Sequence, residues 1–363
     1  MTDPAASTAD AAVSPAPSWL DTPGHREWLR SRFADVLTFA LPSILPGGGF
    51  AYQDADGSPM PGRPPQLFLT ARMAYASSIG VRHGIPGSGG LASANALMVG
   101  HPLAAGLLEQ VIEVIDTRLW DESTQTLLES FAPDWSDCED YRGANANMHG
   151  LEAFLAMGTA TGDAVWHRRG LAIADRLINV AAREQDWLLP EHFTADWQVL
   201  PDYNIDEPNH PFRPYGATFG HSLEWARFLL QLDESPLVES PSWLVEAADE
   251  LTRRALDGGW EVDGRPGLVY TVDWEGDAVA DVRLHWPVCE GIQAAAYLLR
   301  RTGDQHWEGW YRRLWDHAAR YFIDENGAWR NELDENMHQG TQVWPGRPDV
   351  YHCTGALTTP LAV

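Results

Sequence analysis

Histidine and glutamate recur together near the starts of apolar segments with helical spacing. His149 and Glu152 are three residues apart, and His221 and Glu224 repeat that spacing. Residues three apart lie on one face of a helix, so each pair predicts an imidazole whose tautomer is fixed by a neighbouring carboxylate. The other ring nitrogen would then be free to accept or return a proton.

Two other interpretations of these histidines compete with proton transfer. A metal site is one, but the His-Glu-x-x-His pattern is absent and few further ligands lie nearby in the sequence. The other is a purely structural histidine, buried and hydrogen-bonded at the start of a helix. This is the commoner situation for any single histidine. Recurrence at equivalent positions favours a function for the set.

The recurrence has the period of a helical repeat. Spacings of 72, 69 and 62 residues separate four polar helix starts, at His149, His221, Glu290 and His352. Thr161-Gly162-Asp163 and Thr302-Gly303-Asp304 are matching helix stops. Each polar start is followed by a second helix and then a long connection. The pattern predicts an all-α fold in which inner and outer helices alternate in an α/α toroid, with the polar starts converging at one mouth.

Apolar periodicity predicts the elements of this toroid. Helices are expected at residues 23–39, 66–80, 91–99, 102–120, 147–159, 164–183, 221–232, 241–256, 288–301, 305–322 and 351–361. A strand of a small hairpin is expected at 267–274. Residues 1–17, rich in Ala, Ser, Thr and Pro, are expected to form a disordered tail, and 18–363 a single catalytic domain.

Two arginines and several tryptophans are further candidates. Arg213 lies near the end of the long connection 184–220, shortly before His221, where it would either bind an oxyanion or pin the loop. Arg72 lies in a helix interior, where a salt bridge would explain it equally well. Trp225, Trp286 and Trp344 could form stacking walls, although most of the seventeen tryptophans must be structural.

Composition excludes several classes of partner. The net charge of −26 argues against nucleic acid and anionic membranes, which need clustered Lys and Arg. Three scattered cysteines indicate a reducing compartment, and no apolar run approaches the ~18 residues of a transmembrane helix. The N-terminal stretch lacks the basic end and apolar centre of a signal peptide, so a cytoplasmic location is expected.

Short segments along nearly the whole chain carry a family resemblance. They are Leu69-Thr70-Ala71-Arg72-Met73, Asp140-Tyr141-Arg142-Gly143, Asn145-Ala146-Asn147-Met148-His149, Glu191-His192-Phe193, Asp202-Tyr203-Asn204, Phe212-Arg213-Pro214-Tyr215-Gly216, Gly220-His221-Ser222-Leu223-Glu224-Trp225, Trp286-Pro287-Val288-Cys289-Glu290 and Asp349-Val350-Tyr351-His352. In these segments the chain resembles the N-acylglucosamine 2-epimerase superfamily, in its branch of D-mannose and sulfoquinovose isomerases.

The resemblance implies an (α/α)6 barrel with its site at the mouth, and an activity. That activity is interconversion of D-mannose and D-fructose, with D-lyxose and D-xylulose as a second pair, by 1,2-proton transfer through a cis-enediol. No metal or other cofactor is implied, and the partner is a monosaccharide bound by a monomer or homodimer. The resemblance assigns His221 and His352 to catalysis. It assigns substrate binding to Arg72, Asn145, His149, Arg213, Glu224, Trp286 and Glu290.

One departure from the family pattern lies after Arg72. One outer helix and part of an inner helix, about one helical hairpin, are missing near residues 81–91. Sulfoquinovose isomerisation and 2-epimerisation of N-acetylglucosamine or disaccharides are alternative activities. A sugar-binding protein with little activity is the alternative from a different class.

Overall fold

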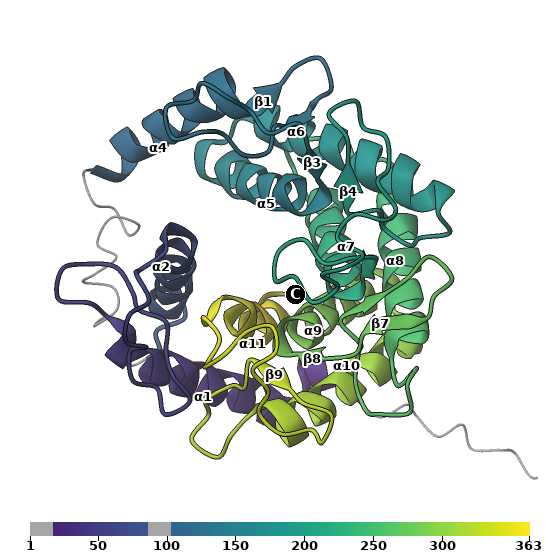
Figure 1. The fold of residues 1–363 in the computed structure, drawn as a ribbon. Helices are drawn as coiled ribbons and strands as arrows, with labels where there is room; N and C mark the ends of the chain where they lie inside the picture. The colour runs from purple at the N-terminus through teal and green to yellow at the C-terminus, as the bar shows by residue number, and fades with distance from the viewer. Residues whose placement is uncertain (1–16, 86–102) are drawn as a thin grey trace, which may run out of the picture.

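Helices arranged in two concentric layers form a ring (Figure 1). The computed structural model describes residues 17–85 and 103–363. Within these ranges the inner helices are α2 (Leu67–Arg82), α5 (Ala144–Thr161), α7 (Phe219–Asp233), α9 (His285–Thr302) and α11 (Tyr351–Ala362). The outer helices are α1 (Pro23–Ala40), α4 (Leu103–Val114), α6 (Ala164–Ala174), α8 (Trp243–Gly259) and α10 (Gln305–His317). The predicted α/α toroid is therefore confirmed as the fold class.

Burial distinguishes the two layers. In α7 every residue from Phe219 to Leu230 is buried, because this inner helix is covered by α5, α8 and α9. The outer helix α8 buries only one stripe, which includes Leu244, Ala247, Ala248 and Leu251. Spacings of three and four residues define such a stripe and leave the opposite face in water. Polar residues within inner helices therefore need partners inside the protein.

The repeated Thr-Gly-Asp motif makes the same turn twice. Gly162 and Gly303 end α5 and α9 with φ of 72° in both cases, a left-handed conformation that glycine adopts without a Cβ penalty. The aspartate that follows each glycine then accepts a hydrogen bond from a backbone N–H in the first turn of the outer helix, at Val165 and His306. The motif thus reverses the chain from inner to outer helix.

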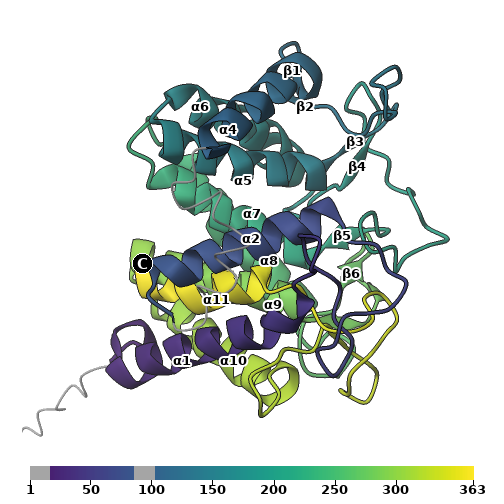
Figure 2. The same ribbon diagram turned by 90° about the vertical axis from the view of Figure 1, so that its left-hand side faces the viewer.

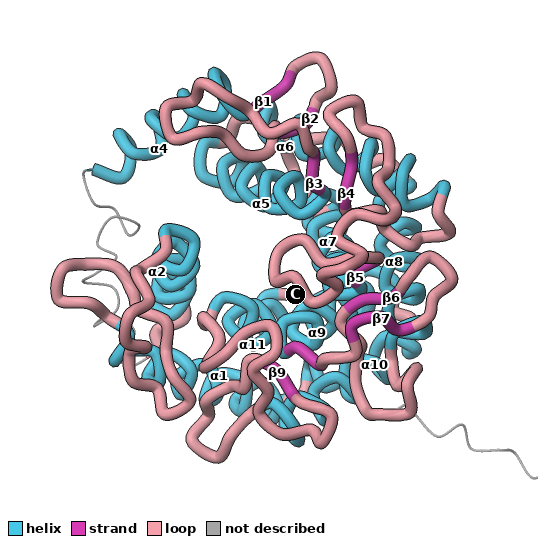
Figure 3. Tube along the Cα trace, in the orientation of Figure 1, coloured by secondary structure: helices cyan, strands magenta, loops and turns pink. Residues whose placement is uncertain are grey.

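Long loops with short strands gather at one end of the ring (Figures 2 and 3). Four small antiparallel sheets are described there: β1 (Trp120–Asp121) with β2 (Thr126–Leu127), β3 (Arg142–Gly143) with β4 (His192–Phe193), β5 (Ala217–Thr218) with β6 (Thr271–Val272) and β7 (Ala278–Ala280), and β8 (Arg283–Leu284) with β9 (Glu332–Leu333). Strands β3, β5 and β8 lead directly into α5, α7 and α9. Each pairing therefore fixes where an inner helix starts. The hairpin expected at 267–274 corresponds to β6 and β7.

The helix predictions agree with the described elements. The segments 102–120, 164–183 and 305–322 form α4, α6 and α10 together with the short π-helical segments that follow them at Ile115–Leu119, Asp175–Ala182 and Ala318–Phe322. The largest differences at the helix starts are two shifts of three residues: α9 begins at His285 rather than at 288, and α5 begins at Ala144 rather than at 147. His149 consequently lies in its second turn, not its first.

The departure expected near 81–91 falls mostly outside the described residues. Helix α2 ends at Arg82, and the description stops after Ile85. The helix predicted at 91–99 and the tail predicted at 1–17, apart from Pro17, also lie outside it.

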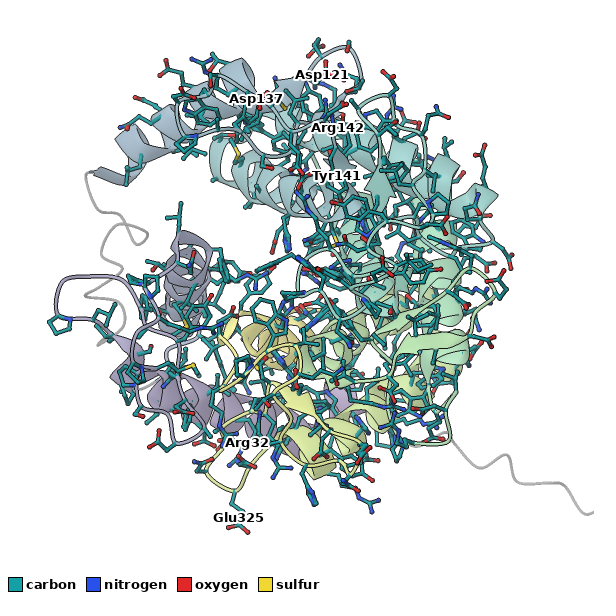
Figure 4. All side chains as sticks on the ribbon, viewed as in Figure 1. Arg32, Asp121, Asp137, Tyr141, Arg142 and Glu325 are labelled. Carbon is teal, nitrogen blue, oxygen red and sulfur yellow. The ribbon has the colours of Figure 1, made fainter. Side chains whose placement is uncertain are left out.

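The periphery and the interior of the ring differ in chemistry. The charged side chains of Arg32 and Glu325 lie at the outer rim in Figure 4. The largest fully buried side chains include Trp225, Trp307 and Trp315, so much of the high tryptophan content serves the core. None of the helices in the described ranges is long and apolar enough to cross a bilayer.

Candidate active site

A cavity of about 280 Å³ opens where the inner helices start. Its size lies just below the ~300–1,000 Å³ of typical small-molecule sites. Seven of the nine site residues expected from the sequence line it: Arg72, Asn145, His149, His221, Glu224, Trp286 and His352. They come from α2, α5, α7, α9 and α11, so the ring brings together residues up to 280 positions apart.

His221, the third residue of α7, is held by a buried carboxylate. Its Nδ1 lies 2.9 Å from Oε1 of Glu191. Glu191 comes just before β4, and its carbonyl accepts a hydrogen bond of 2.9 Å from the backbone N–H of Ala144 at the start of α5. Because a carboxylate accepts, Nδ1 carries the proton and Nε2 keeps its lone pair. His221 is therefore oriented as a general base.

His352, the second residue of α11, has the same arrangement with another partner. Its Nδ1 lies 2.8 Å from Oε1 of Glu290, whose Oε2 accepts a 2.8 Å hydrogen bond from Nε of Arg227. Burial, with a contribution from the nearby charge of Arg72, holds the pKa of His352 well below its ordinary value. The imidazole is consequently neutral at neutral pH and able to accept a proton.

His149 completes a set of three carboxylate-bound imidazoles. Its Nδ1 lies 3.1 Å from Oε2 of Glu152, and the Tyr351 hydroxyl donates to the other oxygen of that carboxylate. Burial lowers the pKa of His149. Burial would raise the pKa of Glu152, but the hydrogen bonds from His149 and Tyr351 and the positive charge nearby, which includes Arg227, outweigh it and bring the pKa to about 2. The i, i+3 pairing expected for His149 and Glu152 is confirmed.

The corresponding pairing expected for His221 and Glu224 is wrong. Glu224 instead lies 3.3 Å from the guanidinium of Arg227, which is also three residues away. The buried Arg227 thus joins the carboxylates of Glu224 and Glu290 on adjacent helices. Burial and the neighbouring Glu290 raise the pKa of Glu224 well above its ordinary value, although the charge of Arg227 opposes them.

Trp286 lies between the two predicted catalytic histidines. Its ring centroid is 5.2 Å from that of His221 and 5.7 Å from that of His352. Gly220 permits this packing, because a Cβ there would lie 2.3 Å from the indole. The indole thereby fixes the separation of the two imidazoles and gives the cavity an aromatic wall.

Arg72 supplies positive charge to the cavity. Its guanidinium lies 3.2 Å from Asp349 and 4.7 Å from the ring centroid of Tyr351. The side-chain oxygen of Asn145, which also lines the cavity, is buried and has no hydrogen-bond partner among residues 17–85 and 103–363, which leaves it available to a ligand hydroxyl.

Two expected binding residues lie outside the cavity wall. Arg213 forms two 2.8 Å hydrogen bonds to Glu139 and lies 4.2 Å from the Tyr141 ring centroid, so it pins the long loop before α7. Glu290 is fully buried and is connected to the cavity through His352 and, by way of Arg227, through Glu224.

A family model supports the sequence resemblance. The model described as N-acylglucosamine 2-epimerase (GlcNAc 2-epimerase) matches residues 90–356. The chain belongs to this family. The resemblance inferred from the sequence is thus confirmed.

Individual members of the N-acylglucosamine 2-epimerase family are similar over nearly their whole length. A D-mannose isomerase of Thermobifida fusca is 40% identical over 392 residues, covering 94% of this chain and 96% of the relative. One of Pseudomonas cannabina pv. alisalensis is 40% identical over 391 residues, covering 95% and 94%. Both alignments are longer than the 363 residues of this chain, so these relatives contain residues that it lacks.

Solved structures share the fold. A D-mannose isomerase crystal structure is similar with a TM-score of 0.84 and 25% identity, covering 96% of this chain and all of the other. Cellobiose 2-epimerase from Spirochaeta thermophila, at 17% identity and a TM-score of 0.74, covers 94% and 97% and shows the fold alone.

Several cavity residues of this family member had no signal in a single sequence. His285, Tyr52, Phe68, Asn331 and Arg347 all line the cavity. His285 directly precedes Trp286 at the start of α9, so its place beside an expected site residue was the available clue. The others lie in or next to loops, and loop paths are not encoded by a helical period.

Two groups of side chains in the described residues have ligand atoms close enough for a metal ion. They are His149, Glu152 and Glu224, and Glu224, Glu290 and His352. In the second group both Glu290 oxygens already have partners in Arg227 and His352. A cation there would lie beside a buried guanidinium and be repelled by it. The geometry favours an internal ion-pair network over a metal centre.

Proposed function

We propose that the protein is an aldose–ketose isomerase that interconverts D-mannose and D-fructose, and by the same chemistry D-lyxose and D-xylulose. The supporting observation is the cavity with three imidazoles, each bound through Nδ1 to its own carboxylate. The relatives named D-mannose isomerase, at 40% identity over nearly the whole chain, give the substrate class. A monosaccharide also matches the small cavity.

The proposed reaction moves one proton between adjacent carbons. Nε2 of His221 removes the proton at C2 of the open-chain aldose, and the C1 carbonyl becomes an enediolate oxygen. The same nitrogen returns a proton to C1, while His352 transfers a proton from O2 to O1 and assists ring opening. Such base catalysis contributes about 10²–10⁴-fold to the rate, and the neutral state of His352 suits its role.

Charge and hydrogen bonds would stabilise the intermediate. Arg72 faces the cavity with its guanidinium, and a fixed donor at the developing oxyanion contributes roughly 3 kcal/mol. Asn145, His149 and Glu224 offer hydrogen bonds to hydroxyls, and Trp286 offers its face to the sugar ring. Glu290 and Arg213 act indirectly. Glu290 holds His352, and Arg213 holds the long loop before α7.

Sulfoquinovose isomerisation is less well supported by the charges. A sulfonate needs fixed positive charge without a competing anion. Of the described cavity residues, Arg72 is paired with Asp349 and Arg347 with Asp324 at 2.7 Å. Neither guanidinium is free of a carboxylate, which favours a neutral sugar.

Ketose formation from D-mannose tests the proposal. Purified protein, dialysed against a chelator, is expected to form fructose at the rate of untreated protein, because no step uses a metal. Sulfoquinovose is expected to react far more slowly in parallel. Release of an epimeric aldose instead of ketose would support the 2-epimerase alternative, and mannose binding without turnover would support the sugar-binding alternative. Loss of activity on chelation would contradict the metal-free mechanism.

The proposal extends to the setting of the enzyme. Three free cysteines, two of them buried, suit a reducing compartment, and we place the protein in the cytoplasm. The site is built from one chain, so a monomer or a homodimer would both be competent.

A further inference from the structure

Glu332 is a fully buried carboxylate that the proposed reaction does not use. Glu332 is the first residue of β9 and pairs with Leu284 of β8. Leu284 directly precedes His285, which lines the cavity. No ion pair to Lys, Arg or His is found for Glu332 within residues 17–85 and 103–363. An uncompensated buried carboxylate is costly unless hydrogen-bond donors surround it.

Backbone amides provide those donors. The N–H groups of Val343 and Trp344 each lie 2.8 Å from Oε2, and the N–H of Gln342 donates to Oε1. The backbone carbonyl of Glu332 also accepts a 2.9 Å hydrogen bond from Gly340. Glu332 therefore holds the start of the segment 340–350 through both its side chain and its backbone carbonyl. We call this segment the strap.

The strap forms one wall of the cavity. The strap residues that line the cavity include Trp344, Pro345, Pro348 and Asp349. The Trp344 ring packs edge-on against Phe212, with centroids 5.1 Å apart. The far end of the strap is fixed by the N–H of Arg347, which donates to the carbonyl of Gln53 at 2.9 Å.

The catalytic histidines are held by separate carboxylates. His221, His352 and His149 depend on Glu191, Glu290 and Glu152, none of which contacts the strap amides. The strap also contains Asp349, the partner of Arg72, but the hydrogen bond from Arg347 to Gln53 lies between Asp349 and the amides that Glu332 holds. Disturbing Glu332 should therefore shift the wall at Trp344 with little effect on the acid–base groups.

We propose that Glu332 is a positioning residue that sets the affinity for the sugar by fixing Trp344 at the cavity wall. The inference rests on the proposed isomerase activity. Glu332→Gln keeps the size of the side chain but replaces one carboxylate oxygen by an NH₂ group. Because NH₂ donates and does not accept, at least one backbone N–H of the strap loses its acceptor. The strap then loses its fixed position.

The test is a comparison of steady-state constants. Glu332→Gln is expected to raise KM for D-mannose about tenfold, with kcat within about twofold and an unchanged pH profile of kcat. Glu308→Gln is the matched control. Glu308 is also buried and accepts hydrogen bonds from Ser18 and Trp19, with an additional ion pair to Arg312, and it lies on the outer helix α10. The Glu308→Gln substitution should lower thermal stability without changing KM.

A double-mutant cycle separates positioning from general destabilisation. In a Trp344→Ala background, Glu332→Gln should add little to KM, because the side chain that it positions is already gone. If Glu332→Gln fails to fold, Gly340→Ala replaces it. A Cβ at Gly340 would lie 2.8 Å from Oε1 of Glu332 and push the carboxylate away, with the same expected rise in KM.

Several outcomes would overturn the inference. The first is an unchanged KM in Glu332→Gln or Gly340→Ala. The second is a Glu332→Gln effect on KM that is as large in the Trp344→Ala background as in the unmodified protein. The third is an equal rise of KM in the control Glu308→Gln. Absence of mannose turnover in the unmodified protein would instead refute the proposed function.

Discussion

Replacing His221 by glutamine is expected to lower kcat for D-mannose isomerisation by about 10³-fold, with a much smaller change in KM. Glutamine has a similar length and can still hydrogen-bond to Glu191, so the surrounding structure should persist. It cannot accept a proton at the position of Nε2. Initial rates of ketose formation, followed for both proteins across substrate concentrations, measure the effect.

Two variants control the His221 experiment. Glu191→Gln should lower kcat less, by about 10–100-fold, because the imidazole remains but its tautomer is no longer fixed. His167→Gln removes a buried histidine of the outer helix α6, hydrogen-bonded to Ser235 and the carbonyl of Leu155, and should leave kcat unchanged. A His221→Gln protein that retains more than a tenth of the activity would show that another residue is the base.

Arg227→Met is expected to cause the largest loss of stability, about 3–5 kcal/mol in the free energy of unfolding. Arg227 is buried between Glu224 and Glu290, and methionine would leave both carboxylates without their cation. Turnover should fall as well, because Glu290 would no longer be held against His352. Denaturant titration at neutral pH gives the free energy, and rates measured well below the midpoint give the turnover.

Arg253→Met is the surface counterpart. Arg253 pairs with Asp249 and Asp304 on the outer layer, with a third of its side chain exposed, so its loss should cost less than about 1 kcal/mol. Adding Glu290→Gln to Arg227→Met should recover part of the stability by removing one uncompensated charge. Equal losses in Arg227→Met and Arg253→Met would mean that the buried network contributes no more than a surface pair.

The periodic part of the fold could be predicted from the sequence because its determinants are local. Thr161-Gly162-Asp163 and Thr302-Gly303-Asp304 contain their own helix stop, left-handed turn and next helix cap. The spacing of His149, His221, Glu290 and His352 places each of them near the start of an inner helix.

The pairing within the site could not be predicted, because it depends on loops. The i, i+3 geometry allowed both His149–Glu152 and His221–Glu224, yet in α7 the buried Arg227 takes Glu224 and the loop before β4 brings Glu191 to His221. Arg213 lies eight residues before His221 in the sequence but bonds to Glu139 from another loop. Similarly, nothing local marks Glu332 as the acceptor for amides ten to twelve residues later.

Turnover of D-mannose in deuterium oxide tests the proton-transfer mechanism most directly. If an imidazole carries the proton between C2 and C1, exchange with solvent during the enediol's lifetime places deuterium at C1 of the fructose formed. Nuclear magnetic resonance or mass spectrometry of that product detects it. Fructose that contains no solvent deuterium, formed in a reaction that a chelator abolishes, would contradict the account, because the two results together would mean a metal-assisted hydride shift from C2 to C1.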